Sequence, residues 1–243
     1  MGDTANINLT EIWDRYNQTR LTGDKRTANK ILGDYIILLK KQEEKEIEEF
    51  VDKICTLTLE IDNKIISNNG TATAEKDTRI QHPLFKEIIL PVLTRQYQKG
   101  SAKHIKWIGQ LEQFFYTDHS TTVSFLKDLN ISKYFYARDF FLKSFAIVPH
   151  QKTLVLLLNR IAKDINYCLH EVPTVVLATP EVLESELAIF REYLHQCDNK
   201  EIWADSLNEW EFIAKHWTAY HKAQEEFIDF EDYLSINGVR LVH

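Results

Sequence analysis

The chain has 243 residues, of which 44% are hydrophobic and 27% charged, a balance typical of a globular protein with one large or two small domains. Only 7 Gly and 5 Pro occur, fewer than the turns of an all-β fold usually need, so we predict an all-α fold. The formal net charge of −7 disfavours nucleic acid and anionic lipid as partners, because both are negatively charged.

The three cysteines, Cys55, Cys168 and Cys197, lie far apart and form no CxxC pair, which argues against a disulfide framework or a zinc ribbon. The N-terminus is polar and has no apolar core of a signal peptide. The longest apolar run, residues 154–158, is too short to span a bilayer. We therefore expect a cytoplasmic protein with no membrane partner.

Apolar residues at three- and four-residue intervals predict three helices in the first part of the chain. The first covers residues 9–16, and Gly23-Asp24 separates it from the second, which covers 31–39. The third runs from Ile47 to Ile65. These helices predict an N-terminal subdomain at residues 1–66.

Residues 67–82 are polar and small, contain an Asn-Gly pair and show no apolar periodicity, so we predict a flexible loop there. It is either a domain boundary or a loop within one domain. Helical spacing resumes after Pro83, and residues 83–243 are expected to form an array of helical hairpins. Pro91 should kink or split its helix, and Gly100-Ser101 should end one helix and begin another.

One segment has the spacing of a known helical repeat. Ala137, Phe141, Ser144 and Pro149 place small, aromatic, small and proline residues at the intervals of a second repeat helix, so residues 134–149 resemble half of a tetratricopeptide repeat. The matching first-helix positions depart from the family pattern, and they hold Thr121, Ser124, Phe125 and Asp128. The resemblance implies stacked helical hairpins that bind a peptide or protein.

Residues 175–177 are β-branched or apolar and follow a proline, but a lone strand would have no partner, so we predict an extended loop. Thr179-Pro180-Glu181 has the features of a helix start. Further on, Trp203, Trp210 and Trp217 recur every seven residues. Ser206 and Glu209 form an S-x-x-E capping box, which predicts a helix from about residue 207 with Trp203 on the preceding turn. We interpret the tryptophans as a packing seam. In all, the pattern predicts nine or ten helices, arranged as an irregular α-solenoid or bundle.

A metal site is one functional hypothesis for these helices. Glu192 and His195 form one ExxH unit of the kind found in di-iron proteins, although no second unit occurs. His221, Glu225 and Asp229 follow one another at four-residue spacing, which on one helix would gather them on one face. The alternative function is therefore a cryptic metal-dependent enzyme. No GxSxG or phosphate-binding glycine loop is present, and we expect no cofactor.

Protein binding is the hypothesis that we prefer. Aromatic residues beside predicted core faces are candidate anchors of an interface, and the acidic stretch 225–232 could dock on a basic partner. The candidate partner-binding residues are Trp107, Tyr134, Tyr136, Trp203, Trp210, Glu225, Glu226 and Asp229. We expect a protein-binding module with helical-repeat character. One version is an acidic inhibitor or immunity-type partner of a basic protein.

Overall fold

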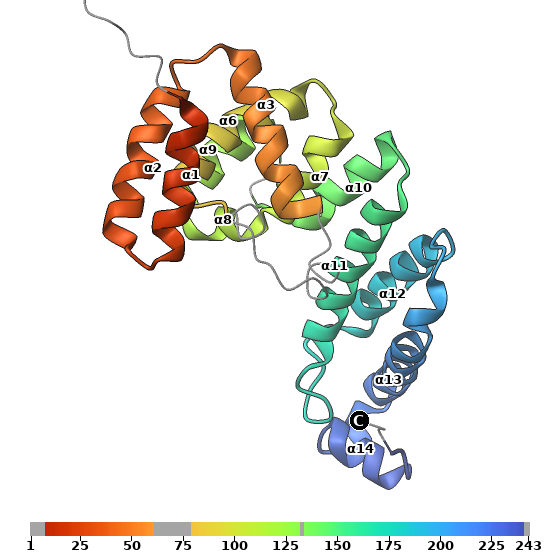
Figure 1. The fold of residues 1–243 in the computed structure, drawn as a ribbon. Helices are drawn as coiled ribbons and strands as arrows, with labels where there is room; N and C mark the ends of the chain where they lie inside the picture. The colour runs from red at the N-terminus through yellow and green to blue at the C-terminus, as the bar shows by residue number, and fades with distance from the viewer. Residues whose placement is uncertain (1–7, 61–78, 132–133, 241–243) are drawn as a thin grey trace, which may run out of the picture. The chain divides into compact units, whose positions relative to one another are not determined.

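The computed structural model describes residues 8–60, 79–131 and 134–240, and within them the protein is all-α, with no strand (Figure 1). This confirms the predicted fold class. The predicted number of helices was too low, because these residues form twelve α-helices of six residues or more. The chain divides into two compact units, residues 1–137 and 138–243. No helix in the described part of the chain is long and apolar enough to cross a membrane.

The first unit consists of short helices joined by tight turns. Its helices are α1 (Leu9–Leu21), α2 (Lys25–Leu39), α3 (Glu44–Cys55), α5 (His82–Leu84), α6 (Leu90–Gln98), α7 (Ala102–Gln110), α8 (Glu112–Thr117) and α9 (His119–Asp128). Two π-helical turns, Thr56–Glu60 and Phe85–Ile89, follow α3 and precede α6.

Local sequence signals set several of these boundaries. Gly23 has a positive φ of 82° between α1 and α2, and the Asp24 side chain caps α2 by accepting from the Thr27 N–H. Pro91 lies at the start of α6, directly after the π-helical turn, so the predicted split is a change of helix type. A helix begins after Ser101, as predicted, but it is short: α7 ends at Gln110 and α8 starts at Glu112.

The predicted N-terminal subdomain, residues 1–66, and the predicted loop, residues 67–82, both fall within the range of the first compact unit. Helices α1 to α3 and the helices from α5 to α9 belong to the same compact unit, and the division between units falls after residue 137. Most of the predicted loop 67–82 lies outside the described residues. Of its described residues, 79–81 have no regular structure, whereas His82 is the first residue of α5.

An ion-pair ladder joins α3 to α6 and α7. Acidic residues at four-residue spacing on α3 face basic residues at the same spacing on the other two helices, so that Glu44 pairs with Arg95, Glu48 with Lys99 and Asp52 with Lys103, at 2.7, 3.5 and 2.7 Å. Exposed pairs of this kind add little stability each, but they fix the register between helices. These pairs also place a carboxylate beside each of the three basic residues, Arg95, Lys99 and Lys103.

A buried histidine ends this ladder. His104 Nε2 lies 2.7 Å from Asp52 Oδ1, and its Nδ1 lies 2.6 Å from Ser101 Oγ, which explains why this N-cap hydroxyl does not bond the α7 backbone. Burial lowers the pKa of His104 below its ordinary value, and the hydrogen bond to Asp52 offsets only part of this effect. The ring is therefore neutral in the folded protein near neutral pH.

His104 should make stability depend on pH. Its folded pKa is depressed, so the unfolded chain takes up a proton at about pH 6.5, before the folded protein does, and acidification through this range favours unfolding. We expect the unfolding free energy to fall between about pH 7 and about pH 5.5, and to fall less in His104→Gln. Urea unfolding at both pH values checks this, and an equal pH dependence in the two proteins would contradict it.

The second unit is built on longer helices. It contains α10 (Ala137–Ile147, which starts at the last residue of the first unit), α11 (Gln151–Leu169), α12 (Pro180–Leu194), α13 (Ala204–Lys222) and α14 (Phe230–Ile236), with 3-10 turns at Lys200–Trp203 and Gln224–Glu226. Helices α11, α12 and α13 pack in sequence order, and α14 packs on α13. The predicted start of α12 is confirmed, because Thr179 is its N-cap and Pro180 its first residue.

The segment that resembles a tetratricopeptide helix forms α10. Ala137, Phe141 and Ser144 are all buried, and the helix ends before Pro149, as this spacing predicts. Small residues at such positions allow close approach of a neighbouring helix. The packing role is therefore present, while the repeat itself stays a prediction.

The tryptophan ladder forms a packing seam whose start differs from the prediction. Helix α13 begins at Ala204, so Ser206 lies inside it and the predicted capping box does not form. Trp203 lies in the preceding 3-10 turn, and its ring lies edge-on to Phe190 at 5.4 Å. Trp210 is buried against the same Phe190, and its Nε1 donates to Asn166 Oδ1 at 2.9 Å. The seam therefore joins α13 to α11 and α12.

Candidate binding surface of the second unit

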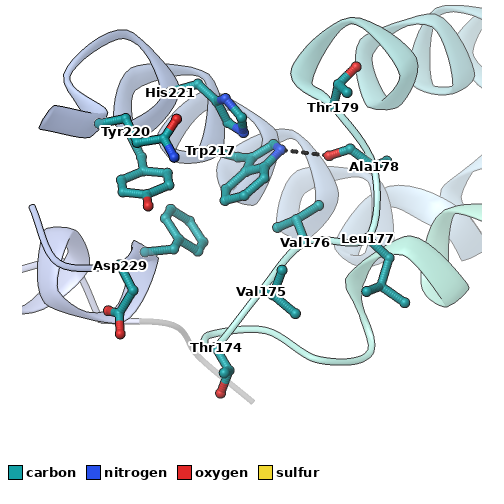
Figure 2. Close-up of a pocket in the computed structure, with 12 residues that line it drawn as sticks. Thr174, Val175, Val176, Leu177, Ala178, Thr179, Trp217, Tyr220, His221 and Asp229 are labelled. Carbon is teal, nitrogen blue, oxygen red and sulfur yellow. Dashed lines mark hydrogen bonds between the residues drawn. The ribbon is translucent and has the colours of Figure 1, made fainter.

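An open pocket of about 570 Å³ lies between the extended segment 174–179, the end of α13 and the start of α14. Figure 2 shows its lining, with Trp217 on the α13 side pointing toward the extended segment. Trp217, Tyr220 and Phe230 supply aromatic rings, while His221 and Asp229 supply polar groups. The volume falls in the range of ligand-binding clefts, although this one is shallow and open.

The extended segment has a defined conformation, as the sequence predicts. The Val175 N–H donates to the Glu171 oxygen at 3.2 Å, and the Leu177 N–H donates to the Cys168 oxygen at 2.8 Å. Side chains alternate along it, so that Val176 is buried while Val175 and Leu177 are exposed. The segment therefore presents two apolar side chains from a tethered backbone.

The Trp217 ring is held in place from both sides of the pocket. Its Nε1 donates to the Ala178 oxygen at 2.8 Å, which is the dashed line in Figure 2. Its ring stacks on Tyr220 at 5.4 Å and lies edge-on to Phe230 at 5.1 Å and to His221 at 4.3 Å. Trp217 is thus a rigid wall of the pocket and not an exposed anchor.

Next to the pocket, the acidic stretch presents one apolar side chain to solvent. The Ile228 N–H donates to Asp232 Oδ2 at 3.1 Å, and the Asp232 N–H donates to Asp229 Oδ1 at 2.8 Å. The Asp229 side chain thus caps α14, and the Asp232 side chain fixes the backbone that precedes the cap. Ile228 is 88% exposed, more than any other large hydrophobic residue in the described part of the chain. If the acidic stretch formed an amphipathic terminal helix, Ile228 would be expected to lie on its buried face.

The negative charge of the protein belongs to the second unit. Residues 1–137 contain 19 Lys and Arg and 19 Asp and Glu, and are formally neutral. Residues 138–243 contain 10 Lys and Arg against 17 Asp and Glu, so this unit carries the whole formal charge of −7. Glu225, Glu226 and Asp229, the predicted acidic contacts, are all exposed. The fixed, exposed Ile228 is therefore surrounded by acidic residues.

The predicted aromatic anchors divide into exposed and buried ones. Tyr134 and Tyr136, in the first unit, are 59% and 53% exposed, as an anchor requires. Trp107 is fully buried, and its Nε1 donates to Glu60 Oε1 at 2.6 Å, so the prediction of an exposed ring is wrong. Trp210 is also buried, and Trp203 is half-buried. These three tryptophans serve packing because neighbouring helices cover them.

The helices do not gather the candidate metal ligands as their spacing in the sequence suggested. Helix α13 ends at Lys222, and a 3-10 turn and an extended residue separate it from Asp229, so His221, Glu225 and Asp229 do not share a helix face. Glu192 and His195 lie exposed at the end of α12. No group of three or more His, Cys, Asp or Glu side chains in the described residues could hold a metal ion.

Two features of this surface could not be predicted from residue spacing, namely the exposure of Ile228 and the pocket itself. Ile228 lies between acidic residues and two phenylalanines, and its backbone is held by the bond from its N–H to Asp232, which in turn donates to Asp229. The D-x-x-D spacing of a helix cap was the signal available for it. The pocket itself brings together residues about 40 positions apart, which no local pattern reveals.

Comparison with known proteins gives no relative. No model of a protein family matches the chain, and neither a curated protein nor a solved structure is similar to it.

Proposed function

We propose that this protein is a protein-binding module whose second unit takes a basic partner. The observation that carries the proposal is the presentation of Ile228. Its side chain is highly exposed, its backbone N–H donates to Asp232, which is itself bonded to Asp229, and it lies in the unit that carries the whole net charge. An apolar anchor within a charged rim is the usual anatomy of an interface. A basic partner would be steered by the rim and anchored by Ile228.

One concrete version of this function is an acidic inhibitor of a basic protein. The negative charge of the second unit would speed association with such a target, and the association rate would fall as salt is added. Binding at an active-site cleft of that target would block it. The same surface would serve any other basic partner equally well.

The first experiment captures the partner and then tests the anchor. The protein is immobilised at moderate salt, the retained protein is identified, and its affinity is measured after purification. We expect a partner with net positive charge, and a loss of at least about tenfold in affinity for Ile228→Ser, equivalent to about 1.4 kcal/mol. Ile202→Ser is the matched control, since Ile202 is exposed in the same unit but lies outside the pocket lining and the acidic stretch.

A second variant removes a negative charge from the acidic stretch and leaves the helix cap intact. Asp229→Asn keeps the N-cap, because Asn accepts the same backbone hydrogen bond, but removes one negative charge. We expect it to slow association with little change in thermal stability. A partner that binds Ile228→Ser and Ile202→Ser equally well, or an acidic partner, would contradict the proposal.

A further inference from the structure

The first unit holds a cavity of its own, which is separate from the surface described above. It lies between α1, α2 and α3 and has a volume of about 410 Å³, within the range of small-molecule sites. All of its lining residues belong to the first unit, between residues 9 and 57. It is more enclosed than the pocket of the second unit, and its size suits one small organic molecule.

Three mutually packed aromatic rings form one wall of this cavity. The Trp13 ring lies 5.1 Å from Tyr35 and 5.4 Å from Phe50, and Tyr35 lies 5.5 Å from Phe50, measured between centroids. Tyr35 is buried, and Trp13 and Phe50 are half-buried. These contacts leave no room for a guest between the rings, so a ligand would lie against their outer faces. Such faces bind apolar groups and attract cations.

A buried acceptor without a partner belongs to the same lining. Asn17 is almost fully buried, and among the described residues its Oδ1 accepts no hydrogen bond. A buried carbonyl oxygen in this condition is destabilising, and a donor that reaches it would remove the penalty. Leu39 and Ile54, which line the same cavity, are apolar and have no side-chain donor. The cavity therefore favours a ligand that carries an N–H or O–H group.

The charged groups of the lining favour a cation over an anion. Asp14, Glu46 and Glu49 are exposed at the cavity, and Lys53 is the single Lys or Arg among the lining residues. Glu46 also accepts from the Glu43 N–H at 3.3 Å, and Glu49 has a distant pair with Lys45 at 3.7 Å. Carboxylates in excess beside aromatic faces complement an ammonium group.

From these four observations we propose that the cavity between α1, α2 and α3 binds an amphipathic primary amine, with its apolar body against Trp13 and Phe50. The ammonium group donates to Asn17 and is held by the surrounding carboxylates. This site is independent of the protein-binding function proposed for the second unit.

The test compares three probes of matched shape by isothermal titration calorimetry on the full chain. The probes are phenylbutylamine, phenylbutanol and phenylbutyrate, which differ in the charge of the terminal group. We expect the amine to bind at least about tenfold more tightly than the alcohol, and the carboxylate to bind most weakly. Equal affinities for the three probes, or no binding of the amine below about 1 mM, would overturn the proposal.

Two sets of variants locate the binding. Asn17→Leu removes the oxygen that has no partner and puts an apolar group of similar size in its place, so it should fold with an unchanged or higher melting temperature and lose amine affinity about tenfold. Asn29→Leu, at an exposed position on α2, is its control. Asp14→Asn with Glu49→Gln alters exposed groups only and should weaken the amine but not the alcohol. Unchanged amine affinity in these variants would show that the amine does not bind in this cavity.

Discussion

Replacing Trp217 with alanine should destabilise the second unit by about 3–5 kcal/mol, the usual cost of removing a buried tryptophan. The ring contacts Tyr220 and Phe230, and its Nε1 donates to the Ala178 oxygen. The substitution therefore creates a cavity in the α13–α14 contact and also releases the extended segment. Urea unfolding followed by far-ultraviolet circular dichroism measures the loss.

Phe212→Ala on the same helix is the control for this change. Phe212 is 41% exposed, and its substitution should cost less than about 1 kcal/mol. Hydrogen exchange should also rise at residues 174–179 in Trp217→Ala and stay unchanged in Phe212→Ala. Equal unfolding free energies for the two variants would show that Trp217 is not a packing residue.

Trp107→Ala should have an effect of similar size in the first unit, about 3–5 kcal/mol. The side chain is fully buried, and its Nε1 donates to the carboxylate of Glu60, which also pairs with Lys106. The variant therefore leaves a cavity and takes one donor from Glu60. The same unfolding measurement applies, with hydrogen exchange in α7 and α3 as a local readout.

Tyr136→Ala is the control, because Tyr136 is exposed in the same unit. We expect it to change the unfolding free energy by less than about 0.5 kcal/mol. If Trp107→Ala were as stable as Tyr136→Ala, the tryptophan would have to lie at the surface, as its position beside the predicted core face first indicated.

Helix boundaries could be predicted from the sequence because the residues that set them act locally. Gly23-Asp24 and Thr179-Pro180 each combine a turn or cap with a helix start, and the structure places a helix end or start at both. The break after Lys222, which separates His221 from Glu225 and Asp229, was missed because residues 223–229 contain no glycine or proline. There the 3-10 turn and the Asp229 cap end the regular spacing.

Burial was harder to predict than helix position. Residues 104–109 of α7 are all buried, so no face of this stretch is left for an exposed ring, and Trp107 is covered although it lies beside the apolar stripe. Ile228 shows the opposite outcome, since it lies next to Phe227 and near Phe230 and is nevertheless exposed. Both outcomes depend on which distant segments pack together, and periodicity within one helix does not contain that information.

The charge asymmetry required the structure as well. The formal charge of −7 is a property of the whole sequence, and its assignment to residues 138–243 depends on knowing where the two units divide. In the first unit, the ladder from α3 to α6 and α7 gives Arg95, Lys99 and Lys103 acidic partners. A partner drawn by charge should therefore meet the second unit.

We propose that the second unit contacts its partner through the surface around Ile228. Hydrogen exchange of the protein alone and in complex with its purified partner tests this claim most directly. We predict protection of residues 224–232 and of the extended segment 174–179, with little change in α1 to α9. Protection confined to the first unit, with none around Ile228, would contradict it.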